Sequence, residues 1–299
     1  TFCGYFNDVR DDVTSENLFA QWEEAKRQTK DFAGCDMIKV YTSGTFFEDQ
    51  EIPIDFQEAV LLETYERGMH LVVEAQAQLC HPEKITWLAT KHPGCTIALG
   101  LEAYDDTVLR FHVNKGFSTK QWHTAVDLLR ENNLRVKTYL IFKPPFMSEG
   151  DALHLTTKWV KQVAPLSDEV SINPMNIQRG TIVDRLFRNR EFRPPWLWSL
   201  VDMIEKTHDE ISKLECRTIV HPTAGGRIRG AHNCGSCDSD VVAAIERYSV
   251  SSNLTEFSNI NCSCKKVWRA EIDNDSNLPT SLGSGVERRA SRVDTVRAP

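Results

Sequence analysis

The sequence predicts an α/β protein built on a partial, TIM-like (β/α)6 barrel of parallel strands. Short β-branched apolar runs recur through residues 36–178, and each is followed by an amphipathic stretch with helix-start signals. The runs are apolar at successive positions, which is typical of parallel strands buried on both faces. Polar residues gather after the runs, at the strand ends where such barrels hold their functional sites. A doubly wound sheet is the alternative with the same pattern.

Five strands and one well-specified helix follow from this pattern. The predicted strands cover residues 37–41, 71–74, 96–101, 136–142 and 170–172. The helix begins after Ser118, whose hydroxyl can cap the first turn while the side chain of Gln121 reaches back. Its apolar face, which we expect to pack on the sheet, consists of Trp122, Ala125, Val126 and Leu129.

The repeating pattern ends near residue 206, and we therefore divide the chain into three parts. Residues 1–205 form the barrel. Residues 206–272 form a small Cys-rich, metal-binding C-terminal extension with one helix over residues 238–248. Residues 273–299 are rich in Ser, Asp, Asn, Gly and Arg and contain few large apolar residues, so we expect a disordered tail.

The composition is that of an ordinary soluble globular protein. The 299 residues include 35 Lys and Arg against 42 Asp and Glu, which gives a net charge of −7. Contact with nucleic acid therefore has to come from local basic patches. No apolar run reaches the roughly 18 residues of a bilayer-spanning helix, and no leader opens the chain. We expect a cytoplasmic protein without a membrane partner.

Nine cysteines, an odd number in a chain without a leader, favour metal binding over disulfides. We expect zinc first, bound by four cysteines near the C-terminal end, with His232 or Cys216 as a possible replacement for one of the four ligands. An auxiliary iron–sulfur cluster and a metal-free, reduced set of cysteines are the alternatives. The short spacings that direct thiolates at one metal ion are found in Cys234, Cys237, Cys262 and Cys264.

A segment rich in arginine and tryptophan covers residues 179–198. Guanidinium groups beside aromatic rings suit phosphate contact and base stacking, so we expect RNA to bind at Arg179, Arg185, Arg188, Arg193 and Trp196. A solvated helix face beside core tryptophans is the alternative. Lys143 precedes two prolines and is a candidate for binding a carboxylate or phosphate; otherwise it flanks a turn.

The chain opens with Thr1-Phe2-Cys3-Gly4-Tyr5 and without a methionine, so we expect a fragment or a processed product. A cysteine just before Thr1 would give two thiolates with an aromatic residue between them, which is half of an iron–sulfur loop. Without such a neighbour, Cys3 is an ordinary small residue.

Nine short motifs occur in an order that resembles a known enzyme family. They are similar to those of the radical S-adenosylmethionine (radical SAM) enzymes that form archaeosine in tRNA, the RaSEA family, which are relatives of the elongator catalytic subunit. The resemblance covers roughly residues 1–270. The motifs are YTSGTF (41–46), VVE (72–74), GLE (100–102), NKGF (114–117), KPPF (143–146), NPMNIQRGT (173–181), RPPWLW (193–198), RGAHNC (229–234) and CSC (262–264).

The resemblance implies a 4Fe-4S cluster and S-adenosyl-L-methionine (SAM) as cofactors. Cys3 would be the last of three cluster thiolates, and the other two would lie upstream of Thr1. Phe2 would lie beside the adenine of SAM. The remaining candidates for cofactor binding are Ser43, Gly44, Thr45, Glu74, Glu102, Asn173 and Gln178, and the catalytic candidates are Lys143 and Glu102. A solvated or ion-paired side chain is the alternative for each carboxylate.

The resemblance also implies a reaction. A 5′-deoxyadenosyl radical would cleave a C–N bond of a lysine-modified 7-deazaguanine at tRNA position 15, a lyase-type step that leaves archaeosine. The partners would be tRNA and the lysine-attaching transferase subunit of archaeosine synthase. Because the given sequence holds at most one cluster ligand and lacks the family's first barrel strand, we expect it to be inactive by itself and to expose a strand edge. Two alternatives stay open: an elongator-type radical SAM enzyme acting on another RNA base or a small molecule, and a non-catalytic zinc-containing RNA-binding protein.

Overall fold

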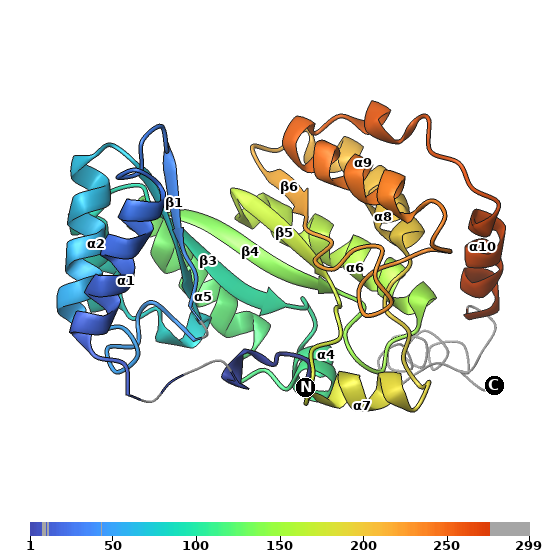
Figure 1. The fold of residues 1–299 in the computed structure, drawn as a ribbon, viewed down its shortest axis with the longest axis horizontal. Coiled ribbons are helices and arrows are strands. Elements are labelled where there is room, and N and C mark those ends of the chain that lie inside the picture. Colours follow the sequence, from blue (N-terminus) through green and yellow to red (C-terminus); the bar gives the residue numbers. More distant parts are fainter. Residues whose placement is uncertain (8–9, 11, 43, 276–299) are drawn as a thin grey trace, which may run out of the picture.

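Six parallel strands form one curved sheet in a computed structural model that describes residues 1–7, 10, 12–42 and 44–275. Each strand pairs with the next one along the chain, so the order in the sheet is the order in the sequence (Figure 1). The predicted α/β fold of a partial barrel is confirmed. The strands are β1 (Met37–Val40), β2 (His70–Ala75), β3 (Thr96–Glu102), β4 (Arg135–Phe142), β5 (Glu169–Pro174) and β6 (Arg217–Val220).

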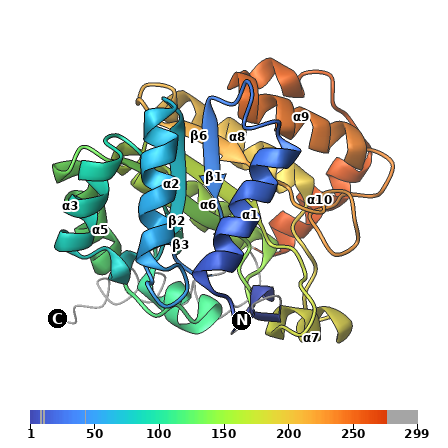
Figure 2. The same cartoon turned by 60° about the vertical axis from the view of Figure 1, so that its left-hand side comes forward.

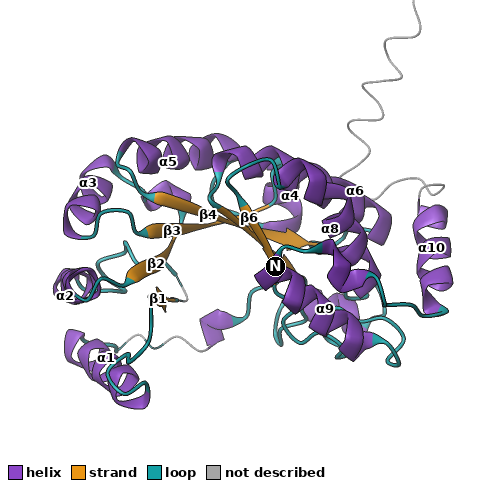
Figure 3. Ribbon diagram, turned by 90° about the horizontal axis from the view of Figure 1, so that it is seen from above, coloured by secondary structure: helices purple, strands orange, loops and turns teal. Residues whose placement is uncertain are grey.

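Helices surround the sheet on its outer side and leave the concave side open (Figure 3). Figure 2 shows α1 and α2 side by side in front of the first two strands. A parallel sheet needs such crossovers, because each strand must return to the same edge before the next one begins. The helices of this layer are α1 (Ser15–Gln28), α2 (Ile54–Glu66), α3 (Pro82–Lys91), α5 (Thr119–Glu131), α6 (Glu149–Val163), α8 (Leu197–Ile211) and α9 (Asp238–Ser251).

Three further helices lie at the ends of the strands or beyond the sheet. They are α4 (Asp106–Val108), α7 (Ile182–Arg188) and α10 (Cys264–Asp275). No helix in the described part of the chain is long and apolar enough to span a bilayer. Short helical turns also occur in the connections between these elements, at Tyr5–Asn7, Ala77–Leu79, Leu109–Val113, Ala164–Leu166 and Leu254–Phe257.

Helix α5 begins as the sequence predicts. The Ser118 hydroxyl accepts a hydrogen bond from the amide of Gln121, and the Gln121 side chain accepts one from the Ser118 amide. The four apolar residues that we expected to face the sheet, Trp122, Ala125, Val126 and Leu129, are all buried. The predicted helix at residues 238–248 is also present, as the larger part of α9.

Strand β6 is the one strand of the described sheet that the sequence analysis did not predict. It has four residues, and it pairs in parallel with β5 in the register Val170 to Thr218. So short a run, which begins with Arg217, gives little periodic signal. The boundaries that we drew at residues 205 and 272 stay predictions. Residues 273–275 end α10, and the rest of the predicted tail lies outside the described residues.

Candidate active site in the half-barrel

The concave side of the sheet holds a cavity of about 830 Å3. Alternate residues of each strand point into it, because successive side chains of a strand face opposite ways. Its floor and walls come from β2 to β5, and the loops that follow these strands close its mouth. Of the residues predicted to act in the site, those that line the cavity are Phe2, Cys3, Gly44, Glu74, Glu102, Asn173 and Gln178.

Cys3 lies at the mouth of the cavity, in an N-terminal segment that hydrogen bonds hold in place before and after the cysteine. The Thr1 hydroxyl donates a hydrogen bond of 2.6 Å to the carbonyl of His112, and the Thr1 carbonyl accepts one of 3.2 Å from the amide of Val183. On the other side, the amide of Gly4 donates to the side-chain oxygen of Gln178. The Cys3 thiol is exposed between these anchors.

Gln178 therefore has a role that its position in the sequence did not indicate. It is a candidate for cofactor binding and lines the cavity, and its side-chain oxygen accepts a hydrogen bond from the Gly4 amide. A Cβ atom at Gly4 would stand 3.1 Å from that oxygen and 3.3 Å from the carbonyl of Arg179, closer than side chains ordinarily approach. Glycine lets the two chain segments meet and so sets the position of Cys3.

Glu74 is a half-buried carboxyl group on the wall of the cavity. Burial raises its pKa above the ordinary value, while its interaction with the Tyr139 hydroxyl acts in the opposite direction. The amide of Thr42, 3.4 Å away, donates a hydrogen bond to it. Burial and the neighbouring Glu74 carboxylate likewise raise the pKa of Tyr139. Glu74 can thus accept or donate a hydrogen bond inside the cavity.

Glu102 forms an ion pair with Lys115 over the backbone of Gly100. The two charged groups are 3.0 Å apart. Glu102 has a φ of +72°, and the pairing of β3 with β4 is irregular between Gly100 and Glu102. A Cβ atom on Gly100 would lie 2.8 Å from the carboxylate and 3.3 Å from the ammonium group, so a larger residue there would displace the pair from its present position. Lys115, in the NKGF motif, is not among the site residues predicted from the sequence.

Of the small residues predicted to bind the cofactor after β1, one lines the cavity and another is buried inside the loop. Gly44 lines the cavity. Thr45 is buried, and its hydroxyl accepts hydrogen bonds from the amides of Phe47 and Gln76, each 3.4 Å away. Its side chain therefore packs into the loop. Ser43 lies outside the described residues.

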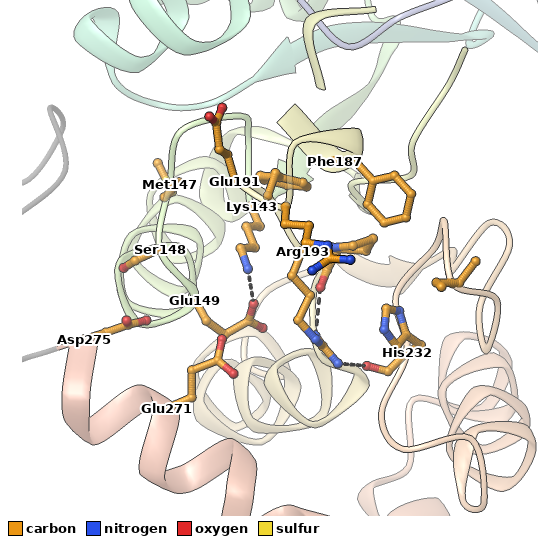
Figure 4. A pocket seen from close by; sticks show the side chains of 14 residues that line it. Lys143, Met147, Ser148, Glu149, Phe187, Glu191, Arg193, His232, Glu271 and Asp275 are labelled. Carbon is orange, nitrogen blue, oxygen red and sulfur yellow. Dashed lines mark hydrogen bonds and ion pairs between the residues drawn. The ribbon is translucent and has the colours of Figure 1, made fainter. Parts of the chain in front are cut away.

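Lys143 occupies a second cavity, of about 430 Å3, beside the start of α6 (Figure 4). Its ammonium group is 2.8 Å from the carboxylate of Glu149, which is fully buried. Glu149 also accepts hydrogen bonds from the amide of Trp196, at 2.9 Å, and from the hydroxyl of Ser199. These partners hold α6, α8 and the strand end of β4 together, and they place the Lys143 ammonium group outside the central cavity.

The residues predicted to bind RNA fall into two groups. Arg179, Arg185 and Arg188 are exposed on α7 and on the loop before it. Arg193 stacks its guanidinium group 3.8 Å from the centre of the Trp196 ring and donates a hydrogen bond of 2.9 Å to the carbonyl of His232. Burial lowers the pKa of Arg193, and Trp196 is itself buried. Only the first group presents its side chains at the surface.

The four cysteines predicted to bind a metal form one group, with sulfur atoms all within 4.8 Å of one another. Neighbouring sulfur atoms are 3.6, 3.7 and 4.0 Å apart. Four thiolates around a zinc ion at 2.3 Å would be separated by about 3.8 Å, so the arrangement fits zinc. His232 is outside the group, and its ring interacts with the carbonyl of Gly230 at 2.8 Å.

Hydrogen bonds to the sulfur atoms fix this group within the fold. The indole N–H of Trp198 donates to Cys264 at 3.2 Å, and the Asn233 amide donates to Cys237 at 3.5 Å. Backbone amides near Ser236 lower the pKa of Cys234 to about 6, which favours the thiolate. Burial raises the pKa of Cys237 and of Cys264, so these two thiols would lose their protons on binding a metal. N–H donors around the sulfur atoms are the usual surroundings of a metal ligand.

Comparison with known proteins identifies the family. No family model matches the chain. It is, however, 31% identical over 278 residues to archaeosine synthase subunit beta of Methanosarcina acetivorans, covering 91% of this chain and 80% of that protein. The chain belongs to the archaeosine synthase subunit beta family. A second member, from Thermococcus kodakarensis, is 29% identical over 266 residues, with 87% and 82% of the two chains covered. The predicted family is thereby confirmed.

Solved structures show the same fold. The archaeal Elp3 of Methanocaldococcus infernus, with its first 46 residues deleted, superposes with a TM-score of 0.59 at 18% identity. The match covers 79% of this chain and 59% of that one, so this chain spans little more than half of the Elp3 chain. The half-barrel of this family is therefore of the type found in Elp3.

Proposed function

We propose that the chain is the radical SAM subunit of an archaeosine synthase and that it cleaves the lysine-derived adduct on a 7-deazaguanine base of tRNA. The observation that carries this proposal is the position of Cys3, which alone among the described cysteines lines the cavity of the half-barrel. The names of the curated relatives support archaeosine as the product and a second subunit as partner. We propose that this second subunit attaches the lysine.

Cys3 is the residue of this chain that would hold the 4Fe-4S cluster, together with two thiolates expected before Thr1. Its thiol is exposed at the cavity mouth, and the anchors at Thr1 and Gly4 fix the backbone on each side of it. When bound, the cluster and SAM supply the 5′-deoxyadenosyl radical of this chemistry. The protein's own task is to orient both reactants and to exclude water.

The polar side chains of the cavity wall would orient SAM. Glu74 and Glu102 are acceptors for its amine and its ribose hydroxyls, and Lys115 fixes the direction of the Glu102 carboxylate. Gly44 leaves space for a close approach of the backbone, and Phe2 offers a ring for the adenine. Asn173 lies across the cavity on β5 and can bind either SAM or the modified base.

The test of this function is an assay of the full-length protein, reconstituted with iron and sulfide under a reductant. We expect it to form 5′-deoxyadenosine from SAM and to convert tRNA carrying the lysine adduct into tRNA carrying archaeosine, as measured by nucleoside mass spectrometry. Unmodified tRNA is the control and should yield no archaeosine. A reconstituted protein that forms no 5′-deoxyadenosine would contradict the proposal.

We further propose that the exposed arginines around α7 bind the tRNA backbone beside the cavity mouth. The double variant Arg179→Ala/Arg185→Ala should weaken tRNA binding. It should also make the slope of log K against log salt concentration shallower by about two, since each lost phosphate contact lowers the magnitude of that slope by about one. Fluorescence anisotropy at several salt concentrations measures both effects. Arg130→Ala, on the outer helix α5, is the matched control; an equal effect there would contradict a local RNA site.

We also propose that zinc occupies the group of four cysteines. The sulfur separations and the N–H donors to two of the sulfur atoms support a divalent metal with a preference for sulfur. Such a metal would join the loop before α9 to the first turn of α10, because Cys237 precedes the one and Cys264 begins the other.

A further inference from the structure

The floor of the cavity holds a buried cation that the proposed cofactor site does not use. Lys137 on β4 lines the cavity and is 3% exposed. Its ammonium group is 2.9 Å from the carboxylate of Glu169, its direct neighbour on β5. An ammonium group has three N–H donors, so one ion pair leaves the others free for a further acceptor in the cavity.

Further basic side chains lie near Lys137. Lys39 on β1 and His221 after β6 face the same region, and burial followed by repulsion from Lys137 lowers the pKa of each. Arg217 adds to the repulsion felt by Lys39. Two carboxylates face Lys137: Glu169, with which it forms its ion pair, and Glu74 on the cavity wall, whose pKa the Lys137 charge lowers against the effect of burial.

A buried hydroxyl group adds a second donor. Ser171 on β5 is fully buried, lines the cavity, and has no hydrogen-bond partner for its hydroxyl within the described residues. It lies two residues beyond Glu169 on the same face of the strand, beside Tyr139. A buried hydroxyl without a partner destabilises the fold, and a bound acceptor would remove that cost.

We propose that Lys137 and Ser171 bind a carboxylate group of the substrate on the cavity floor. An ammonium group and a hydroxyl, both desolvated, are complementary to the two oxygens of a carboxylate. The identification of this group as the carboxylate of the lysine portion rests on the proposed function. Lys137 lies near the beginning of β4, whereas Cys3 lies at the ends of the strands, so the lysine chain would extend along the cavity between them.

The test compares two synthetic nucleosides, the 7-deazaguanine adduct of L-lysine and the same adduct of cadaverine, which is lysine without its carboxylate. Their dissociation constants are measured by calorimetry with the full-length, reconstituted protein. We expect the wild type to bind the lysine adduct about 10- to 100-fold more tightly, as is typical for a hydrogen-bonded charge. Lys137→Met should abolish this preference, and Ser171→Ala should reduce it.

The variants are chosen so that misfolding does not decide the outcome. Ser171→Ala removes an unpaired hydroxyl at nearly constant volume and should fold as the wild type does. Lys120→Met, on the surface of α5, is the control for the loss of a lysine and should keep the preference. Equal binding of the two adducts by the wild type, no binding of either, or a preference kept in both cavity variants would overturn the subsite. A failure of the proposed function is detected by a different assay, in which the wild type would form no 5′-deoxyadenosine from SAM.

Discussion

The Cys3→Ala variant of the full-length protein is expected to form no 5′-deoxyadenosine. Cys3 is the one thiol that the described cavity walls offer to a cluster, and a cluster with one ligand fewer does not hold SAM in the geometry for its cleavage. Iron content and the visible absorbance of the reconstituted protein report the cluster, and chromatography reports the product. We expect both the absorbance and the product to be lost.

Cys35→Ala is the matched control for this experiment. Cys35 is half-buried before β1 and does not line the cavity, so its removal should leave the iron content and the product unchanged. The thermal unfolding temperature of Cys3→Ala should also stay near that of the control without cofactors, because the Cys3 thiol is exposed. Product formation by Cys3→Ala at the rate of the control would remove the basis of the proposed function.

The second large effect is expected from removing the metal of the four-cysteine group. Cys237→Ser should eliminate one zinc ion per chain and lower the unfolding temperature on the order of 10 °C. Structural zinc sites contribute about 10 kcal/mol or more in small domains, and a part of that energy would here hold α8, α9 and α10 together. Metal analysis by mass spectrometry and a thermal melt measure the two effects.

A cysteine outside the group provides the comparison. Cys216 is half-buried just before β6 and does not belong to the four-cysteine group, so Cys216→Ser should keep the zinc ion. A chelator should lower the unfolding temperature of the wild type and of Cys216→Ser by the same amount, and that of Cys237→Ser hardly at all. A wild type isolated without metal, and insensitive to the chelator, would show that the cysteines act as free thiols.

Much of the fold could be predicted because its signals are local. The capping residues and apolar face of α5 lie within a dozen residues, and the five predicted strands are short, mainly apolar runs. The spacing of the cysteines likewise indicated a common group, since two short spacings suffice to direct four thiolates at one point. Strand β6 escaped prediction because four residues that begin with a charge carry no clear period.

The site was harder to predict because its geometry depends on contacts between distant segments. Lys115 reaches Glu102 only because the backbone of β3 turns at a positive φ. Lys143 forms an ion pair with Glu149, and Arg193 stacks on the Trp196 ring. The spacing of these residues in the sequence does not predict either contact. A sequence shows which residues carry charge, but the partner that neutralises a buried charge is decided by tertiary structure.

The curved sheet is not closed into a barrel, since β1 and β6 do not pair in the described part of the chain. A closed barrel admits only what can descend along its axis. An interrupted wall also allows entry from the side, which matters for a nucleotide that is joined to others both before and after it. Such a nucleotide has no free end to insert, and a half-barrel lets its base swing inward while the polymer stays outside.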